Sequence, residues 1–313
     1  MDAPKQQPYQ HPTDAVWFIT GCSSGLGKAL AQHAYNSGYR VVATARKVST
    51  IDYLPDFAQG GKSARISLDV TEPGSISNAI SEAIKYFGHI DVFVNNAGYA
   101  LSGDTENAMD RDARDLMDTN FWGTVNVTKQ ALNILRDVNN HRIEGGRKGG
   151  VIMNVTSMGG RVAFAGNAFY HASKFAVEGF TESVAKEVRP EWNIHLCCIE
   201  PGGVQTGYIS NTKHIEPHPA YTAPDTPSRV LEQYMANPEA TKGWAKPENI
   251  AKAMFDVVAQ GGQIPLHVPL GPDSWGLIKG ILDRQQKELE EGRELAHKVG
   301  EEGQLESVSF LKE

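Results

Sequence analysis

Cysteine is scarce in this chain, and long apolar runs are missing. Only three of the 313 residues are cysteine, too few for the disulfide framework of a small secreted protein, so we expect all three to be reduced. No stretch reaches the roughly 18 to 20 apolar residues that a membrane-spanning helix needs, and the first residues do not resemble a signal peptide. These absences predict a soluble, cytoplasmic protein without a membrane span.

Signals for a metal or a nucleic acid are also missing. The ten histidines are scattered and no C-x-x-C occurs, so the sequence predicts no metal site. The 30 basic residues do not cluster, which argues against nucleic acid as a partner. The formal net charge of −7 is uneven, because residues 283–313 hold nine acidic and five basic residues, a net −4. The acidity belongs mainly to this tail.

The composition is that of an ordinary globular protein. Hydrophobic residues make up 40% and charged residues 21% of the chain, which argues against a disordered, collagen-like or coiled-coil protein. At roughly 150 residues per domain the length allows two domains, but a single α/β sheet can also use it.

Short β-rich runs alternate with helical stretches along the chain. The candidate strands are residues 16–20, 40–45, 64–68, 92–95, 151–155, 194–199 and 264–268. The candidate helices are residues 26–34, 76–86, 109–135, 168–188 and 247–258. Several strands are almost entirely apolar, as expected when helices cover both faces of a parallel sheet. We predict a doubly wound α/β domain.

Three segments depart from this alternation. Residues 1–13 are polar, and we expect a flexible arm. Residues 204–246 hold five prolines and little periodicity, which predicts either a substrate lid or a disordered insertion. Residues 271–313 form an acidic extension, in which residues 275–299 have the pattern of an amphipathic helix that packs on the domain edge or on a partner.

A glycine-rich loop, TGCSSGLG at residues 20–27, follows the first strand and opens the first helix. Gly21, Gly25 and Gly27 would let the backbone approach a pyrophosphate, whose charge meets the N–H groups at the helix N-terminus. The same residues also satisfy the G-x-S-x-G pattern of a hydrolase nucleophile elbow, with Ser23 as nucleophile. An elbow usually follows a later strand, which favours the phosphate site.

A second cluster combines Ser157, at the end of the fifth strand, with Tyr170 and Lys174 near the start of a helix. Residues four apart share one helix face, so an ammonium can lie close to the phenol and lower its pKa from about 10. Ser157 lies at the carboxyl end of a strand, where doubly wound sheets bind ligands. Taken alone, Tyr-x-x-x-Lys is more often a solvated helix face.

The motifs together resemble the short-chain dehydrogenase/reductase family over about residues 14 to 270. The elements in matching order and spacing are TGx3GxG at 20–27, NNAG at 95–98, Asn120, Ser157, Tyr170-x3-Lys174 and PGx3T at 201–206. The resemblance implies one Rossmann domain with a parallel seven-stranded sheet, helices on both faces, the lid inserted at 204–246, and the helical extension after residue 270.

The resemblance also implies the catalytic roles. Tyr170 would donate a proton to a carbonyl oxygen in reduction, or act as the base in oxidation. Lys174 would lower the pKa of Tyr170 and hold the nicotinamide ribose, Ser157 would orient the substrate oxygen, and Asn120 would hold a water in the proton relay. The hydride would come from the nicotinamide, so no metal is needed.

The implied cofactor site extends along several strand ends. Its residues are Gly21, Ser23, Ser24, Gly25, Leu26, Gly27, Arg46, Asp69, Val70, Asn96, Ala97, Gly98, Tyr170, Lys174, Pro201, Gly202, Val204 and Thr206. NAD-specific sites place a carboxylate after the second strand. Here Ala45 occupies that position and Arg46 follows, so its guanidinium, helped by Ser23, suits the 2′-phosphate of NADP(H).

The substrate is less sharply indicated. Tyr208, Tyr221, Tyr234 and Trp244 in the lid would form an aromatic wall, and the glycine loop is similar to the steroid and retinoid dehydrogenase branch. We expect a medium-sized hydrophobic carbonyl or alcohol, with polyketides and other secondary metabolites equally open. A non-catalytic NADP-binding regulator stays an alternative, because fold alone does not prove activity. Family members often pair as homodimers or homotetramers through helices that here are residues 109–135 and 168–188.

Overall fold

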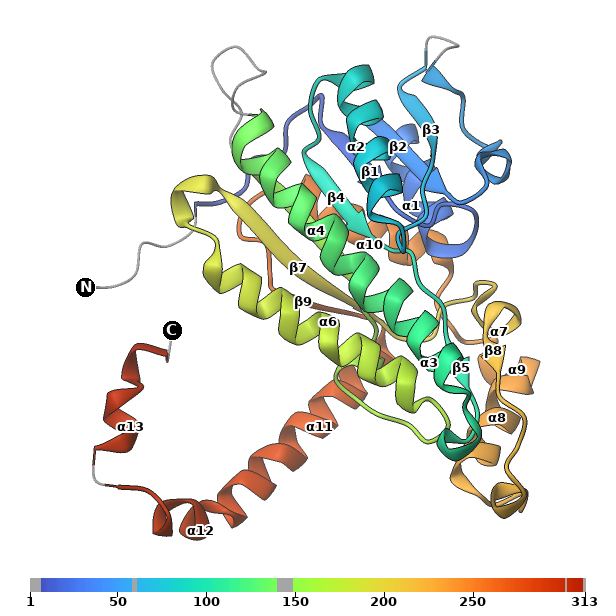
Figure 1. Ribbon diagram of the computed structural model, residues 1–313, viewed down its shortest axis with the longest axis vertical. Helices are drawn as coiled ribbons and strands as arrows, with labels where there is room; N and C mark the ends of the chain where they lie inside the picture. Colours follow the sequence, from blue (N-terminus) through green and yellow to red (C-terminus); the bar gives the residue numbers. More distant parts are fainter. Residues whose placement is uncertain (1–6, 58–60, 140–148, 302, 312–313) are drawn as a thin grey trace.

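A parallel sheet of seven strands forms the centre of the molecule (Figure 1). The computed structural model describes residues 7–57, 61–139, 149–301 and 303–311. The strand order is β3-β2-β1-β4-β6-β7-β9, and every neighbouring pair is parallel. The strands are β1 Val16–Ile19, β2 Arg40–Ala45, β3 Ser63–Ser67, β4 Val92–Asn95, β6 Gly150–Val155, β7 Ile194–Pro201 and β9 His267–Leu270. The predicted seven-stranded Rossmann architecture is confirmed.

Helices cover both faces of the sheet. One face packs on α1 Gly25–Asn36 and α10 Pro247–Ala259, and the other on α2 Pro73–Phe87, α4 Gly123–Asn133 and α6 Ala168–Glu187. The adjacent residues Cys197 and Cys198 are both buried, and only Cys197 belongs to the core beneath α1 and α10. The alternation of side chains along β7 therefore divides them between the two faces.

Two of the expected elements have different bounds. The last strand begins at His267 rather than at residue 264, because Pro265 lacks the N–H group that a ladder needs. The expected helix at 109–135 is divided into α3 Asp110–Met117, a π-helical turn at Asp118–Trp122, and α4, which leads into a second π-helical turn at Ile134–Val138. The first π-helical turn carries Asn120.

The predicted lid is built from short elements attached to the domain at its base. These elements are α7 Tyr208–Asn211, β8 Lys213–His214, α8 Pro227–Ala236 and α9 Pro238–Thr241. Strand β8 pairs with β5 Leu101–Ser102, and a bridge between Val204 and Ala245 closes the base. The buried Asp104 carboxylate accepts hydrogen bonds from Ser228 (2.7 Å) and Arg229 (3.1 Å). The Pro-rich segment is thus folded rather than a disordered insertion, and its role as a substrate lid stays a prediction.

The two ends of the chain behave differently from each other. Residues 1–6 of the expected arm lie outside the described residues, but Tyr9 is only 4% exposed and pairs with Gly262 through backbone hydrogen bonds. The Tyr9 ring packs edge-on against His195, so the arm is anchored to the domain at this residue. The flexibility expected of the arm as a whole stays a prediction.

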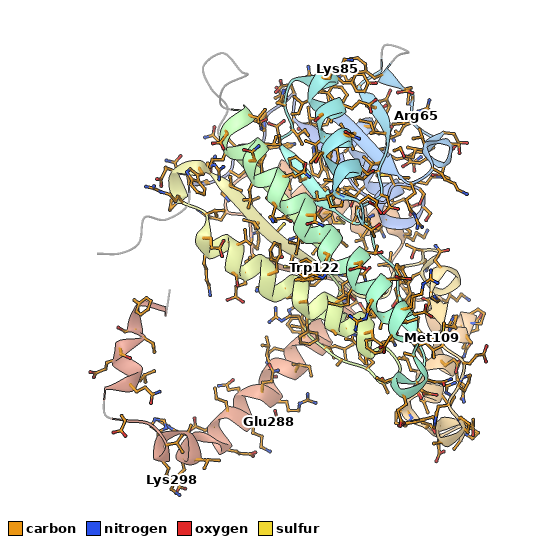
Figure 2. All side chains as sticks on the ribbon, viewed as in Figure 1. Arg65, Lys85, Met109, Trp122, Glu288 and Lys298 are labelled. Carbon is orange, nitrogen blue, oxygen red and sulfur yellow. The ribbon has the colours of Figure 1, made fainter. Side chains whose placement is uncertain are left out.

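The C-terminal extension projects away from the sheet as α11 Pro272–Glu291, α12 Arg293–Lys298 and α13 Gln304–Ser307 (Figure 1). The helix expected at 275–299 is interrupted at Gly292, which suits a helix end. Only the start of α11 packs on the domain, through the buried Ser274 and Ile278. Farther along, Glu288 and Lys298 extend into solvent (Figure 2). Within the described residues, no helix combines the length and hydropathy needed to cross a bilayer.

Candidate active site

The glycine loop is held in a tight turn by close backbone contacts. Gly21 has a φ of +72°, which favours glycine, and a Cβ on Gly21 would lie 2.8 Å from Ala97 Cα. The Asn96 side chain donates to the carbonyl oxygens of Thr20 (2.9 Å) and Gly21 (3.2 Å). Thr20 Oγ1 in turn accepts hydrogen bonds from the backbone of Asn96 and Ala97. Asn96, predicted to bind cofactor, therefore also positions the predicted phosphate loop.

The N-terminus of α1 opens at this loop. Ser24 is the N-cap residue, but its side chain makes no capping hydrogen bond. The first N–H groups of a helix have no partner within the helix, and the helix dipole makes this end attractive for an anion. Ser23 and Ser24 are exposed there, beside Gly25. The loop therefore has the geometry of a pyrophosphate site.

One large cavity, about 1800 Å³, joins this loop to the catalytic candidates. It is lined by every predicted site residue except Gly27 and Asn120, which are buried behind its wall. The carboxyl ends of the parallel strands all open at one edge of the sheet, which is why motifs far apart in sequence meet here. The volume exceeds that of most single-ligand pockets, as expected if a dinucleotide and a substrate share it.

Arg46 lies at one end of the cavity, directly after β2. It is exposed, while Ala45 before it is buried. Among the described residues, no carboxylate forms an ion pair with the Arg46 guanidinium. The guanidinium is thus available for an anionic ligand, and the absence of an acidic side chain at position 45 removes the usual repulsion of a 2′-phosphate.

Asp69 has a structural task besides lining the cavity. Its Oδ1 atom accepts hydrogen bonds from the Thr71 backbone N–H (3.0 Å) and hydroxyl (2.7 Å). This is the turn-capping role that an aspartate at a strand end often has. Val70, which follows it, is buried against the Gly123 backbone of α4. Contact of this pair with a cofactor stays a prediction.

The Tyr170 and Ser157 side chains meet in the middle of the cavity. Ser157 lies two residues after the end of β6, and its Oγ atom accepts a hydrogen bond from Gly159 N–H at 3.0 Å. Burial raises the pKa of Tyr170, and side-chain hydrogen bonds with Ser157 and Tyr208 act in the opposite direction. The two hydroxyls of Ser157 and Tyr170 therefore face one position, where a substrate oxygen could contact both.

Lys174 is turned toward the sheet. Its Nζ atom donates to the Val155 carbonyl oxygen at 2.9 Å and lies 5.9 Å from the Tyr170 ring centroid. Burial lowers the pKa of Lys174 to about 8. The Lys174 ammonium is thus close to the Tyr170 ring, as the four-residue spacing predicts. Its effect on the pKa of the phenol stays a prediction.

Asn120 is buried within the first π-helical turn. Its Oδ1 atom accepts from Tyr99 N–H (3.0 Å), and its Nδ2 atom donates to the Tyr99 carbonyl (2.9 Å) and to Ser173 Oγ (3.1 Å). These bonds use three of the four hydrogen bonds that a side-chain amide can make. Asn120 thus ties the Gly98–Tyr99 segment to α6, and its role in holding a water stays a prediction.

His171, which follows Tyr170 in the sequence, is a buried positioning residue. Its Nδ1 atom contacts the Gly159 carbonyl (2.9 Å), and its Nε2 atom accepts from Phe164 N–H (3.0 Å). Burial lowers the pKa of His171, so the neutral ring can serve both contacts. It fixes the loop that follows Ser157. Adjacency to Tyr170 was the available signal, but its partners could not be read from spacing.

The lid supplies the aromatic wall only in part. Tyr208, Tyr234 and Trp244 line the cavity, and Trp244 Nε1 donates to the Tyr234 hydroxyl at 3.2 Å. Tyr221 does not line it, because its hydroxyl bonds the Glu106 carboxylate outside the cavity. The prediction for Tyr221 is therefore wrong, since the lid turns this side chain to the outer surface.

A partly buried ionic cluster lies near Lys174. His267 Nδ1 contacts Glu178 Oε2 at 3.2 Å and Glu200 Oε1 at 3.1 Å, and Arg161 pairs with Glu200 at 3.1 Å. The hydrogen bonds with Glu178 and Glu200 raise the pKa of His267 to about 9. The ligand atoms of Glu178, Cys198 and His267 lie within 4.8 Å of one another. We therefore interpret these side chains as an ion-pair network, in which a protonated His267 lies between two carboxylates.

Comparison with known proteins decides the family. Residues 15–216 match the family described as short chain dehydrogenase. The chain belongs to that family. It is 43% identical over 302 residues to the oxidoreductase calM of Penicillium decumbens, covering 95% of this chain and 96% of the relative. It is 34% identical over 291 residues to an uncharacterized oxidoreductase of Schizosaccharomyces pombe, covering 93% of each.

Solved structures agree with this assignment. A short-chain dehydrogenase from Streptomyces avermitilis superimposes with a TM-score of 0.78 at 29% identity, covering 93% of this chain and 100% of that one. A Burkholderia phymatum short chain dehydrogenase/reductase in complex with NAD has a TM-score of 0.72 at 21% identity, covering 88% and 95%. This short-chain dehydrogenase is therefore an oxidoreductase of the class that acts on CH–OH and C=O groups with nicotinamide cofactors.

Proposed function

We propose that this short-chain dehydrogenase uses NADPH to reduce the carbonyl group of a medium-sized hydrophobic substrate, or NADP⁺ to oxidise the corresponding alcohol. One observation carries the proposal. The Ser157 and Tyr170 hydroxyls face a common position in the same cavity that the glycine loop and the α1 N-terminus open into. A ligand spanning this cavity would have its phosphates at one end and its reacting atoms at the other.

The residues present fit a dinucleotide phosphate. A side chain on Gly21 or Gly27 would displace the loop that shapes the cradle, since their Cβ atoms would lie within 3.0 Å of neighbouring backbone or of Asn96. Ser23, Ser24 and the N–H groups of α1 would hold the pyrophosphate, and Arg46 the 2′-phosphate. When bound, the nicotinamide supplies or accepts the hydride. NADP(H) usually serves reductions in cells, which favours a carbonyl reductase.

The protein's own side chains would transfer the proton to or from the substrate oxygen. Ser157 would donate a hydrogen bond to the substrate oxygen, and Tyr170 would give a proton to that oxygen in reduction or remove it in oxidation. Lys174, whose pKa burial lowers to about 8, would hold the nicotinamide ribose and place positive charge near the phenol when its Nζ atom leaves Val155. Asn120 would keep the Tyr99 segment against α6 through its amide.

The substrate class is inferred from apolar and aromatic side chains of the cavity wall. Phe164, Tyr208, Tyr234, Met235 and Trp244 line the cavity. Such apolar and aromatic surfaces favour a hydrophobic ring system over a sugar or a small acid. A ketone, aldehyde or alcohol of steroid, retinoid or polyketide size is consistent with these side chains.

A direct test is NADPH consumption with cyclohexanone, benzaldehyde, a 3-ketosteroid and retinal as substrates. We expect turnover of at least one of them by the wild type, and a loss of at least about 100-fold in Tyr170→Phe, as when a general acid is removed. NADPH affinity should be retained. Full turnover by Tyr170→Phe would overturn the assigned proton donor.

Two rival functions predict other results. NADPH binding without turnover on a broad carbonyl panel would favour a non-catalytic NADP-binding regulator. Hydrolysis of an activated ester that is abolished by Ser23→Ala would favour the nucleophile elbow. No contact of the described residues favours either alternative over the reductase, because Ser23 lies among glycines at the α1 N-terminus and Tyr170, Ser157 and Lys174 are all present.

A further inference from the structure

Tyr208 connects the lid to the catalytic tyrosine. It is the first residue of α7 and lies two positions after the 201–206 segment. Its ring packs edge-on against Tyr170, with ring centroids 6.0 Å apart and an interplanar angle of 66°. The two side chains also share a hydrogen bond. A residue of the lid therefore reaches the oxygen atom that the proposed reaction uses.

Hydrogen bonds hold the Tyr208 backbone, and apolar contacts hold its ring. Its backbone N–H donates to Thr206 Oγ1 at 3.1 Å, and its carbonyl accepts from Thr212 Oγ1 at 2.8 Å. Its ring packs in a small cluster with Leu101 and Leu116. These contacts reduce the freedom of the ring, so the hydroxyl is oriented before a substrate binds.

Tyr208 is suited to donate rather than to accept. Burial raises the pKa of Tyr208 well above its usual value, and the neighbouring Tyr170 raises it further. Burial therefore favours the neutral form of the Tyr208 hydroxyl, which carries a proton to donate. The other titratable groups around Tyr170 are Lys174 and His171 on α6 and Tyr99 after β4, and His171 is neutral and already bonded at both nitrogens.

We propose that Tyr208 is a lid-borne hydrogen-bond donor to the Tyr170 oxygen, so that the docked lid completes the catalytic group of hydroxyls. This rests on the proposed function, because it assumes that Tyr170 transfers the proton. The donor stabilises the phenolate form, which is the base in oxidation and the product of proton donation in reduction. Tyr208 is a positioning residue that acts through Tyr170.

Tyr208→Phe separates this role from that of an apolar wall, because phenylalanine keeps the ring and removes only the hydroxyl. With the carbonyl and alcohol pair that the wild type turns over best, we expect kcat for oxidation to fall about fivefold to tenfold near neutral pH, while KM changes less than twofold. Loss of the donor raises the pKa of Tyr170. The rising limb of the pH profile should therefore move to higher pH by roughly one unit.

A second measurement needs no substrate. The tyrosinate absorbance of wild type minus Tyr170→Phe gives the titration of Tyr170 itself, and Tyr208→Phe minus the double variant gives it without the donor. We expect the Tyr170 midpoint to be higher in the second difference. Circular dichroism over the same pH range checks that the fold persists. Coincident midpoints would overturn the proposal.

The matched control is Tyr221→Phe, which removes another lid hydroxyl that contacts Glu106 outside the cavity. Its kcat and pH profile should equal those of the wild type. A Tyr208→Phe enzyme with raised KM and an unchanged profile would make Tyr208 only a substrate wall, contrary to the proposal. Failure of the proposed function looks different, since in that case Tyr170→Phe itself retains turnover.

Discussion

A Cβ atom on Gly27 would lie 2.4 Å from the side-chain nitrogen of Asn96. That nitrogen donates to the carbonyls of Thr20 and Gly21, which shape the glycine loop. Gly27 therefore does not line the cavity, but its lack of a side chain leaves room for the Asn96 amide that shapes the loop. The close approach of α1 to the end of β4 depends on the missing side chain.

Gly27→Ala should accordingly weaken NADPH binding by at least about tenfold, because Asn96 must move and release the loop. Fluorescence titration of NADPH measures this. Gly179→Ala is the matched control, because Gly179 lies in α6 with no atom within 4 Å of its added Cβ, and alanine favours a helix interior. The control should bind NADPH normally and be slightly more stable. Equal Kd values for both variants would contradict the steric argument.

The sheet could be predicted from the sequence because its strands are short, nearly all apolar runs between helices. The break in the helix expected at 109–135 could not be predicted from the sequence. The π-helical turn at Asp118–Trp122 depends on tertiary contacts, in which Asn120 bonds the backbone of Tyr99 and the side chain of Ser173. Such partners are distant in sequence, and nothing in the local helical pattern indicates them.

The candidate site was predictable where spacing alone sets geometry. Tyr170 and Lys174 are four apart on α6, so they share a face. Tyr208 is different, because its contact with Tyr170 depends on how the lid docks through β8 and Asp104. The ionic cluster likewise depends on the parallel register that pairs Cys198 with His267. The residues in these contacts were visible in the sequence, but their proximity was not.

Arg46→Ala should raise KM for NADPH at least about tenfold and leave KM for NADH unchanged, because only NADPH carries the 2′-phosphate that the guanidinium would bind. Steady-state kinetics with the two cofactors measures this. Lys47→Ala removes the neighbouring positive charge, which does not line the cavity, and should have little effect on either constant. An unchanged preference for NADPH in Arg46→Ala would contradict the assignment.

His267 should make stability depend on pH, because Glu178 and Glu200 raise its pKa to about 9. A group whose pKa is raised by folding stabilises the protein fully below its unfolded pKa, about 6.5, and this contribution is lost as the pH rises through about 9.

We therefore expect His267→Gln to reduce the free energy of unfolding by roughly 1 to 2 kcal/mol at pH 6, a figure discounted because a third of the side chain is exposed to solvent. The difference from wild type should shrink toward pH 10. Urea unfolding at both pH values measures it. His297→Gln, on the exposed α12, should match the wild type at each pH. A deficit in His267→Gln that stays constant with pH would instead mean that the ring contributes by packing alone.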